Sequence, residues 1–151
     1  MADNEQHWLI LIMRLSGRSG TPRMRIWRAL RGLGAAVLRD GVYLLPASPT
    51  RREALELQVG AIRELGGNAL LIEVDDSAID SVEVLPSLFD RTPDFQALRA
   101  AVADWKQACP QLEERDAQRQ LTQLQRRLQS IVEIDFFPGS ESERAIMALA
   151  E

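Results

Sequence analysis

Arginines are the residues of this sequence with the clearest potential for chemistry. Arg25, Arg28 and Arg31 recur every three residues, and on an α-helix, which turns by about 100° per residue, they share one face. A guanidinium presents its N–H donors in a planar fork that suits phosphate and carboxylate oxygens. The spacing therefore indicates either a helix face that contacts nucleic-acid phosphates or a solvated face whose arginines pair with the chain's own acids. Three further arginines complete the candidate nucleic-acid-binding set: Arg18, Arg23 and Arg39.

A second candidate is the segment 16–21, which joins an expected strand to the amino terminus of an expected helix. Free backbone N–H groups and the helix dipole favour anions at such a place. The segment is either a plain loop or a receptor for phosphate or for a tetrahedral oxyanion such as chromate. It is not a P-loop, because Pro22-Arg23 stands where Gly-Lys-Ser/Thr is required. The candidate anion-binding residues are Arg14, Arg18, Ser19 and Thr21.

Other reactive side chains give less specific patterns. The acids Asp75, Asp76, Asp80 and Glu83 form either a hard-cation site or a solvated acidic linker, and they lack the glycine and closing glutamate of an EF-hand loop. One His and one Cys cannot form a structural zinc site within one chain. No Ser, His and Asp set has a recognisable spacing. We expect no enzyme, no cofactor and no metal site.

The distribution of charge favours an anionic partner. The chain has 151 residues and a formal net charge of −4. Residues 1–52 carry nine arginines and three acids, or +6, whereas the rest carries nine bases and nineteen acids, or −10. A basic front half is typical of proteins that meet nucleic acid or other anions.

Neither a membrane span nor a secretory signal is evident. No apolar run approaches the roughly 20 residues that a transmembrane helix needs. The first six residues are polar and acidic, unlike the start of a signal peptide. We expect a cytoplasmic protein with no membrane partner.

The elements that position the arginines follow from local signals. The apolar run 8–13 predicts a buried strand, and Thr21 as N-cap with Pro22 after it predicts a helix that ends at Gly34. Asp40-Gly41 predicts a hairpin turn. A second helix follows Ser48, and residues 69–74 predict a fourth strand. The order β-α-β-β-α-β over about residues 8–74 predicts an α+β, ferredoxin-like fold.

The remainder of the chain reads as a helical extension. We expect helices at about 94–109, 111–132 and 140–150. In the second of these, Leu121, Leu124, Leu128 and Ile131 form a seam at helical spacing, suited to internal packing or to pairing with another helix. The predicted organisation is a ferredoxin-like domain over residues 1–76, with a helical extension over 77–151 packed on it.

Several segments resemble one known family. The segments 8–15, 22–35 and 40–46 resemble the amino-terminal domain of the chromate resistance protein ChrB, and 64–71 and 135–137 fit the same pattern in the same order. The module is also similar to that of the phenylacetate repressor PaaX and of CRISPR spacer-adaptation nucleases. Those nucleases place an Asp at the end of the first strand, whereas Met13-Arg14-Leu15 offers none. This departure argues against metal-dependent cleavage.

The resemblance implies a function and a partner. ChrB proteins are regarded as chromate-responsive transcriptional regulators, and their amino-terminal part is the presumed DNA-binding end. They usually continue into a second domain linked to chromate, which these 151 residues do not include. The expectation is a homodimer that binds a double-stranded DNA operator through the arginine-rich helix. The alternative is a module that binds or senses chromate or sulfate without binding DNA.

Overall fold

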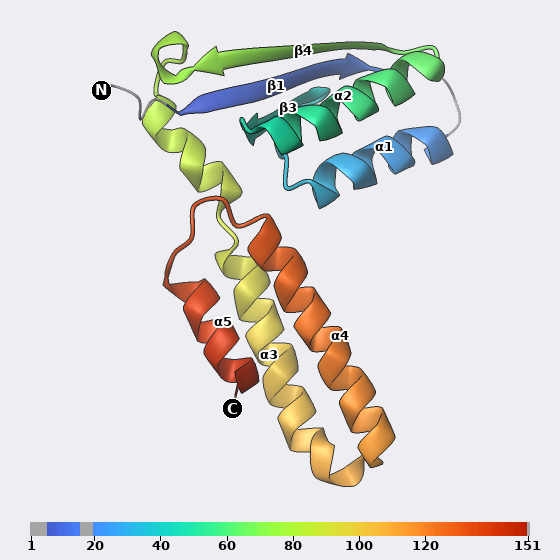
Figure 1. Cartoon of the computed structure of the whole chain (residues 1–151), viewed down its shortest axis with the longest axis vertical. Coiled ribbons are helices and arrows are strands. Elements are labelled where there is room, and N and C mark those ends of the chain that lie inside the picture. The colour runs from blue at the N-terminus through green and yellow to red at the C-terminus, as the bar shows by residue number, and fades with distance from the viewer. Residues whose placement is uncertain (1–5, 16–19, 151) are drawn as a thin grey trace. The chain divides into compact units, whose positions relative to one another are not determined.

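The structure, a computed structural model, describes residues 6–15 and 20–150. It divides into two compact units, residues 1–88 and 89–151. The described residues form a mixed α+β protein with one four-stranded antiparallel sheet and five α-helices (Figure 1), so the predicted α+β class is confirmed. Residues 77–88, which the sequence assigns to the helical extension, are grouped with the sheet in the first unit. The packing of the extension on the sheet domain stays a prediction.

The first unit is built around strand β1. Its apolar run places Leu9 and Leu11 in the interior with no exposed surface. β1 pairs with β3 on one side and with β4 on the other, and the strand order β2-β3-β1-β4 is antiparallel throughout. The predicted Asp40-Gly41 turn joins β2 to β3, and Gly41 has the positive φ of 79° that such turns require. The strands are β1 His7–Arg14, β2 Ala36–Arg39, β3 Val42–Pro46 and β4 Asn68–Asp75.

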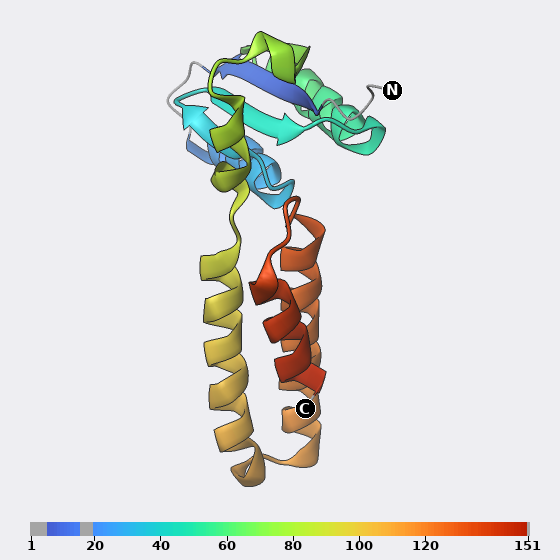
Figure 2. The same cartoon turned by 90° about the vertical axis from the view of Figure 1, so that its left-hand side faces the viewer.

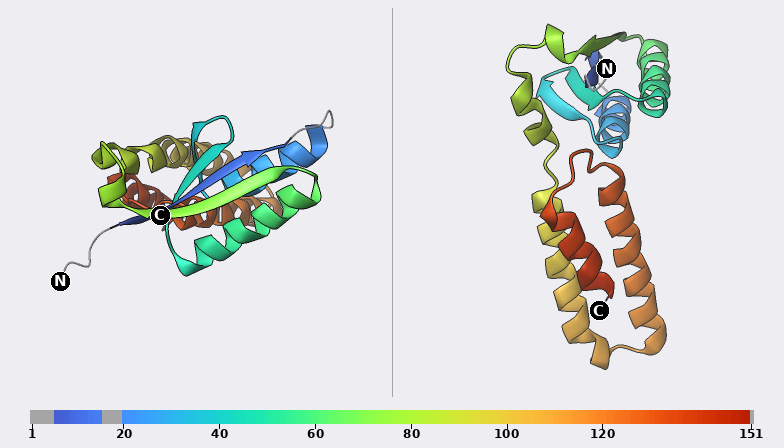
Figure 3. Two further views of the ribbon diagram at one scale, coloured as in Figure 1. Left: turned by 90° about the horizontal axis from the view of Figure 1, so that it is seen from above. Right: turned by 60° about the vertical axis from the view of Figure 1, so that its left-hand side comes forward.

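Helices α1 (Gly20–Gly32) and α2 (Pro49–Glu64) lie side by side on one face of the sheet (Figures 1 and 3). Both are amphipathic, and their apolar residues are buried. Removing this apolar surface from water is the main stabilisation of the unit, at about 25 cal/mol per Å². The buried helical residues are Ile26 and Leu30 of α1 and Leu55, Val59 and Ile62 of α2.

The two helices begin differently and end alike. α2 begins after the N-cap Ser48, whose side chain accepts a hydrogen bond from the Arg51 backbone N–H at 3.0 Å. The prediction that Thr21 caps α1 is wrong, because α1 already includes Gly20 and Thr21 lies inside its first turn. Each helix is followed by a glycine of positive φ, Gly34 (85°) after α1 and Gly66 (84°) after α2. The backbone hydrogen bonds there are those of a Schellman motif.

The second unit is helical (Figure 2). α3 (Thr92–Ala108) and α4 (Glu114–Glu133) form a hairpin through a short 3-10 turn, and α5 (Ser140–Ala150) returns along α3. The leucine seam of α4 packs inward, because Leu124 and Ile131 join Phe95, Leu98 and Val102 in one buried cluster. In the described part of the chain, no helix is both long and apolar enough to span a bilayer.

A pair of 3-10 segments follows β4, at Asp76–Ala78 and Val82–Phe89. The second of these spans the place where the two units divide. Phe89 is fully buried, and its ring lies 5.7 Å from that of Phe136 and 5.9 Å from that of Phe137, centroid to centroid. Phe136 and Phe137 thus pack against Phe89 at the start of the helical unit.

Candidate nucleic-acid interface

The arginine face of α1, defined by Arg25, Arg28 and Arg31, is exposed. Ile26 and Leu30, on the opposite side of the same helix, retain 3% and 0% of their exposure. The helix carries four arginines and no acid between Gly20 and Gly32. The amphipathic pattern therefore fixes which side of α1 packs on the sheet, and it leaves a compact positive surface in water.

Within the described ranges, the arginine face is free of carboxylate partners. Arg25, Arg28 and Arg31 form no ion pair there, and no side-chain hydrogen bond. In the part of the chain that the structure describes, the one polar interaction of these three side chains is a cation–π contact, with the Arg31 guanidinium carbon 5.1 Å from the centroid of the Trp27 ring. Of the two interpretations that the sequence leaves open, pairing with the chain's own acids is not seen among these residues.

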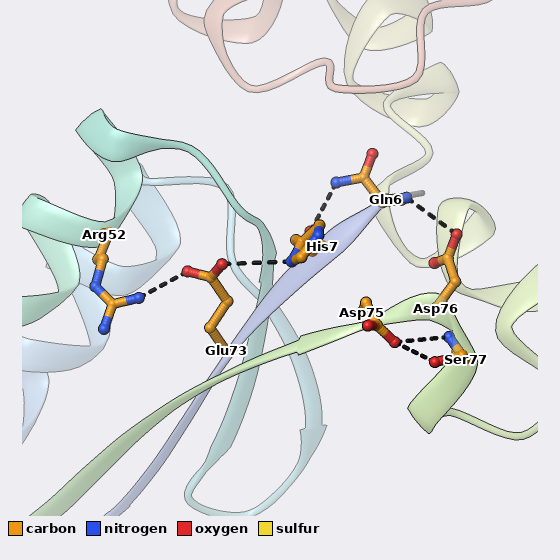
Figure 4. Close-up of polar contacts among 7 residues, drawn as sticks. All are labelled: Gln6, His7, Arg52, Glu73, Asp75, Asp76 and Ser77. Carbon is orange, nitrogen blue, oxygen red and sulfur yellow. Dashed lines mark hydrogen bonds and ion pairs between the residues drawn. The ribbon is translucent and has the colours of Figure 1, made fainter. Parts of the chain in front are cut away.

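Many of the acids are engaged elsewhere. Glu73 accepts from Arg52 at 2.7 Å and lies 3.4 Å from the His7 ring nitrogen (Figure 4). Glu56 is a second partner of Arg52, at 3.3 Å. In the helical unit, Glu141 pairs with both Arg99 and Arg144. The Arg52–Glu73 and Arg99–Glu141 pairs each join two elements of one unit, whereas the other two pairs lie within one helix. The acids they use are therefore engaged away from α1.

The charge asymmetry of the sequence does not coincide with the structural units. Residues 1–88 carry ten bases and eleven acids, a net −1, and residues 89–151 carry eight bases and eleven acids, a net −3. The acids of α2 and β4 offset the basic first 52 residues. The positive charge is local to α1, which has a net +4, rather than a property of half the molecule.

The candidate anion-binding residues are only partly brought together. Arg14 is exposed at the end of β1, and Arg23 donates a 2.6 Å hydrogen bond from Nη2 to the Leu15 carbonyl oxygen. Both line one pocket of about 520 Å³, which sequence reasoning missed. Thr21 is exposed on α1 and does not line that pocket. Arg18 and Ser19 lie outside the described residues, and Arg39 is exposed on β2.

The pocket lies where α1, the end of β1 and the β2–β3 turn meet. Its lining includes Trp27 and Tyr43, so Tyr43 lies beneath α1 and is not an exposed base-stacking residue on the open sheet. Burial, together with the charge of Asp40, raises the pKa of the Tyr43 phenol, so this hydroxyl is neutral at physiological pH. The lining residues are Met13, Arg14, Leu15, Arg23, Met24, Ile26, Trp27, Asp40, Gly41 and Tyr43.

The acidic junction after β4 has a structural use. The Asp76 carboxylate accepts a 2.8 Å bond from the indole of buried Trp8 and a 3.1 Å bond from the Gln6 backbone N–H. Asp75 accepts from the hydroxyl and backbone N–H of Ser77 (Figure 4), and these bonds lower its pKa. Among the described residues, no group of three or more His, Cys, Asp or Glu is arranged to hold a metal ion. The junction after β4 is therefore hydrogen-bonded to Gln6 and Trp8, at the start of β1.

Comparison with known proteins assigns the chain to a family. The model described as "Protein ChrB, N-terminal" matches residues 23–151. The chain belongs to this ChrB N-terminal family. The matched range includes the whole arginine face and Arg23, and it begins after Arg14. The resemblance to ChrB noted in the sequence is confirmed.

One curated relative extends this family assignment. "Protein ChrB" of Cupriavidus metallidurans is 30% identical to the chain over 141 residues, which are 93% of this chain and 44% of that protein. The chain thus spans less than half the length of this ChrB relative. No solved structure matches the chain.

Proposed function

We propose that the chain is the DNA-binding part of a ChrB-type regulator of chromate resistance and that it contacts duplex DNA through the arginine face of α1. The observation that carries the proposal is the state of Arg25, Arg28 and Arg31. They are exposed on one helix that has no acid, and no described residue forms an ion pair with them. Charges held apart from their own acids are suited to phosphate oxygens, which position a protein on DNA.

The proposal includes a fold and an assembly. The elements from His7 to Asp75 follow one another as β-α-β-β-α-β, and β1 is central. This arrangement supports a ferredoxin-like domain that presents α1 on its surface. Operators are commonly two-fold symmetric, so the proposed regulator acts as a homodimer. Its proposed location is the cytoplasm. The leucine seam of α4 is largely used inside its own unit, which favours a sheet edge as the dimer contact.

The experiment is a duplex-binding measurement on the triple variant Arg25→Glu, Arg28→Glu, Arg31→Glu. Fluorescence anisotropy with labelled fragments of a chromate-resistance operon's promoter region measures the affinity. Three lost phosphate contacts of about 1 kcal/mol each correspond to about a 100-fold weaker Kd. Because the three side chains have no carboxylate partner among the described residues, the melting temperature of the variant should match that of the wild type.

A matched control separates local charge from total charge. Arg115, Arg126 and Arg127 are exposed on α4, and their reversal to glutamate changes the net charge by the same amount. This control variant should keep most of the duplex affinity. Equal losses in the two triple variants, or intact binding after reversal on α1, would show that the arginine face is not the binding surface.

A second candidate function rests on Arg14 and Arg23, which line one pocket. In this case the module binds chromate or sulfate and does not bind DNA. A ligand that binds only the folded state stabilises it by mass action, so sodium chromate or sulfate at millimolar concentration should raise the melting temperature. Absence of any shift beyond that of sodium chloride at equal ionic strength rejects this function.

A further inference from the structure

The pocket beneath α1 has polar groups that the fold leaves unused. Arg14 and Asp40 form no ion pair with any described residue, and the Tyr43 hydroxyl has no hydrogen-bond partner in the described ranges. Toward the residues that the structure describes, Arg23 uses only Nη2, for the Leu15 carbonyl oxygen. Polar groups that converge on one concavity and lack internal partners are what ligand sites use to fix orientation.

The three tryptophans of the chain sharpen this contrast. The indole N–H of Trp8 donates to Asp76 at 2.8 Å, and that of Trp105 donates to the Ala117 carbonyl oxygen at 3.2 Å. The indole N–H of Trp27 has no acceptor among the described residues, and the residue is 37% exposed. A buried indole N–H normally has an acceptor within the protein, whereas an exposed one is open to solvent or to a ligand. Trp27 therefore keeps its donor available at the pocket, and Arg31 lies over its ring.

The size and composition of the pocket select the class of ligand. A volume of about 520 Å³ falls in the range of pockets that hold small organic molecules. A tetrahedral oxyanion would meet Arg14 and Arg23, but it has no apolar part for the aromatic rings and for Met13 and Met24. A ligand that fits this lining therefore combines three features: an anionic group for the guanidiniums, an aromatic ring for Trp27, and a hydrogen-bond donor for Asp40.

We propose that this pocket binds a small aromatic anion of the purine mononucleotide type, with the phosphate at Arg14 and Arg23 and the base on Trp27. The Asp40 carboxylate accepts from a hydroxyl or amino group of the ligand, and the Tyr43 hydroxyl completes the polar contacts. The site is separate from the arginine face, because Arg25, Arg28 and Arg31 are absent from its lining. The two surfaces meet where Arg31 lies over the Trp27 ring.

The probe is AMP, titrated into the full 151-residue chain by calorimetry and by NMR of the indole N–H groups. Calorimetry should give a saturable 1:1 binding curve with a Kd below about 1 mM. In the spectrum, the Trp27 indole resonance, assigned from a Trp27→Phe variant, should shift, whereas the Trp8 and Trp105 resonances stay in place. Adenosine, which lacks the anion, and inorganic phosphate, which lacks the ring, should each bind at least tenfold more weakly.

Variants locate the site and separate it from DNA binding. Arg14→Gln should weaken AMP binding about tenfold, whereas Arg39→Gln, an exposed arginine outside the lining, should leave it unchanged. The double variant Arg25→Gln, Arg28→Gln, which leaves Arg31 over the Trp27 ring, should still bind AMP, so this inference and the proposed function fail independently. AMP binding that disappears in the double variant, phosphate that binds as well as AMP, or an unshifted Trp27 resonance at saturating AMP would each overturn the proposal.

Discussion

Helices α1 and α2 lie on the same face of the same sheet, and each carries exposed or half-exposed arginines. In α2, Arg51 donates to the Pro46 carbonyl oxygen at 2.6 Å, and Arg52 joins Glu56 and Glu73. Arg63 donates to the Ala69 carbonyl oxygen at 3.1 Å. Each arginine of α2 therefore ties the helix to a neighbouring strand or to its own next turn.

The arginine face of α1 has no such role in the described part of the chain. Its helix has no acids, whereas α2 contains three glutamates. Two helices of one layer thus hold the same residue type in different states: the arginines of α2 are bonded within the fold, whereas those of the arginine face have no carboxylate partner among the described residues. A cluster of arginines therefore indicates a binding surface only once its internal partners are known.

The largest effect on stability should come from Arg51 of α2. Arg51→Met keeps the apolar stem but removes the charged donor at the buried Pro46 carbonyl oxygen. Hydrogen bonds to charged groups contribute about 1.5–3 kcal/mol, so urea unfolding should show a loss of about 2 kcal/mol with duplex affinity unchanged. Arg28→Met is the matched change on α1 and should cost less than about 0.5 kcal/mol. The opposite order of the two losses would break the contrast between the helices.

A smaller effect is expected from Glu73, which holds Arg52 of α2. Glu73→Gln removes the 2.7 Å pair with Arg52 and the 3.4 Å contact with His7. Because these side chains are partly exposed, the loss should be below about 1 kcal/mol, and it should shrink as salt screens the pair. The control is Glu64→Gln, because Glu64 lies on the same helix as Arg52 and has no ion pair among the described residues. A loss of stability that does not change with salt would mean that Glu73 stabilises the fold through packing and not through its charge.

The smallest effect concerns Tyr43, beneath α1. Burial, assisted by the charge of Asp40, raises the pKa of its phenol above 10.0. A raised folded-state pKa gives stability that is fully present below the unfolded-state pKa and is lost as the pH rises through the folded-state value. The free energy of unfolding should therefore fall above about pH 10, and Tyr43→Phe should reduce that fall. Identical alkaline profiles for the two proteins would contradict this.

The elements of the first unit were predictable because their signals are local. The apolar run of β1, the Asp40-Gly41 turn and the Pro49 start of α2 each depend on a few adjacent residues. The exact start of α1 was missed. Thr21 and Pro22 are residue types that favour the N-cap and the first helical position, but α1 already includes Gly20, so both lie inside its first turn. Element boundaries depend on contacts that residue types alone do not specify.

The site was predictable only in part. Helical periodicity correctly indicated which side of α1 faces water, since the apolar residues Ile26 and Leu30 are buried. The pocket could not be predicted, because it joins residues of β1, α1 and the β2–β3 turn. The structural role of the acidic junction could not be predicted either, because Asp76 accepts a hydrogen bond from Trp8, which lies 68 positions away in the sequence. The Asp75 and Asp76 spacing alone suggested a cation site or a linker.

The salt dependence of duplex binding shows whether the arginine face of α1 contacts DNA phosphates. Each phosphate neutralised on B-DNA contributes about 0.9 to the slope of log affinity against log salt concentration. For the variant Arg25→Gln, Arg28→Gln, Arg31→Gln, the slope should become shallower by about 2.7, three times that value. The corresponding glutamine variant of Arg115, Arg126 and Arg127 should keep the wild-type slope. An unchanged slope in the α1 variant would contradict the claim that its arginine face binds DNA.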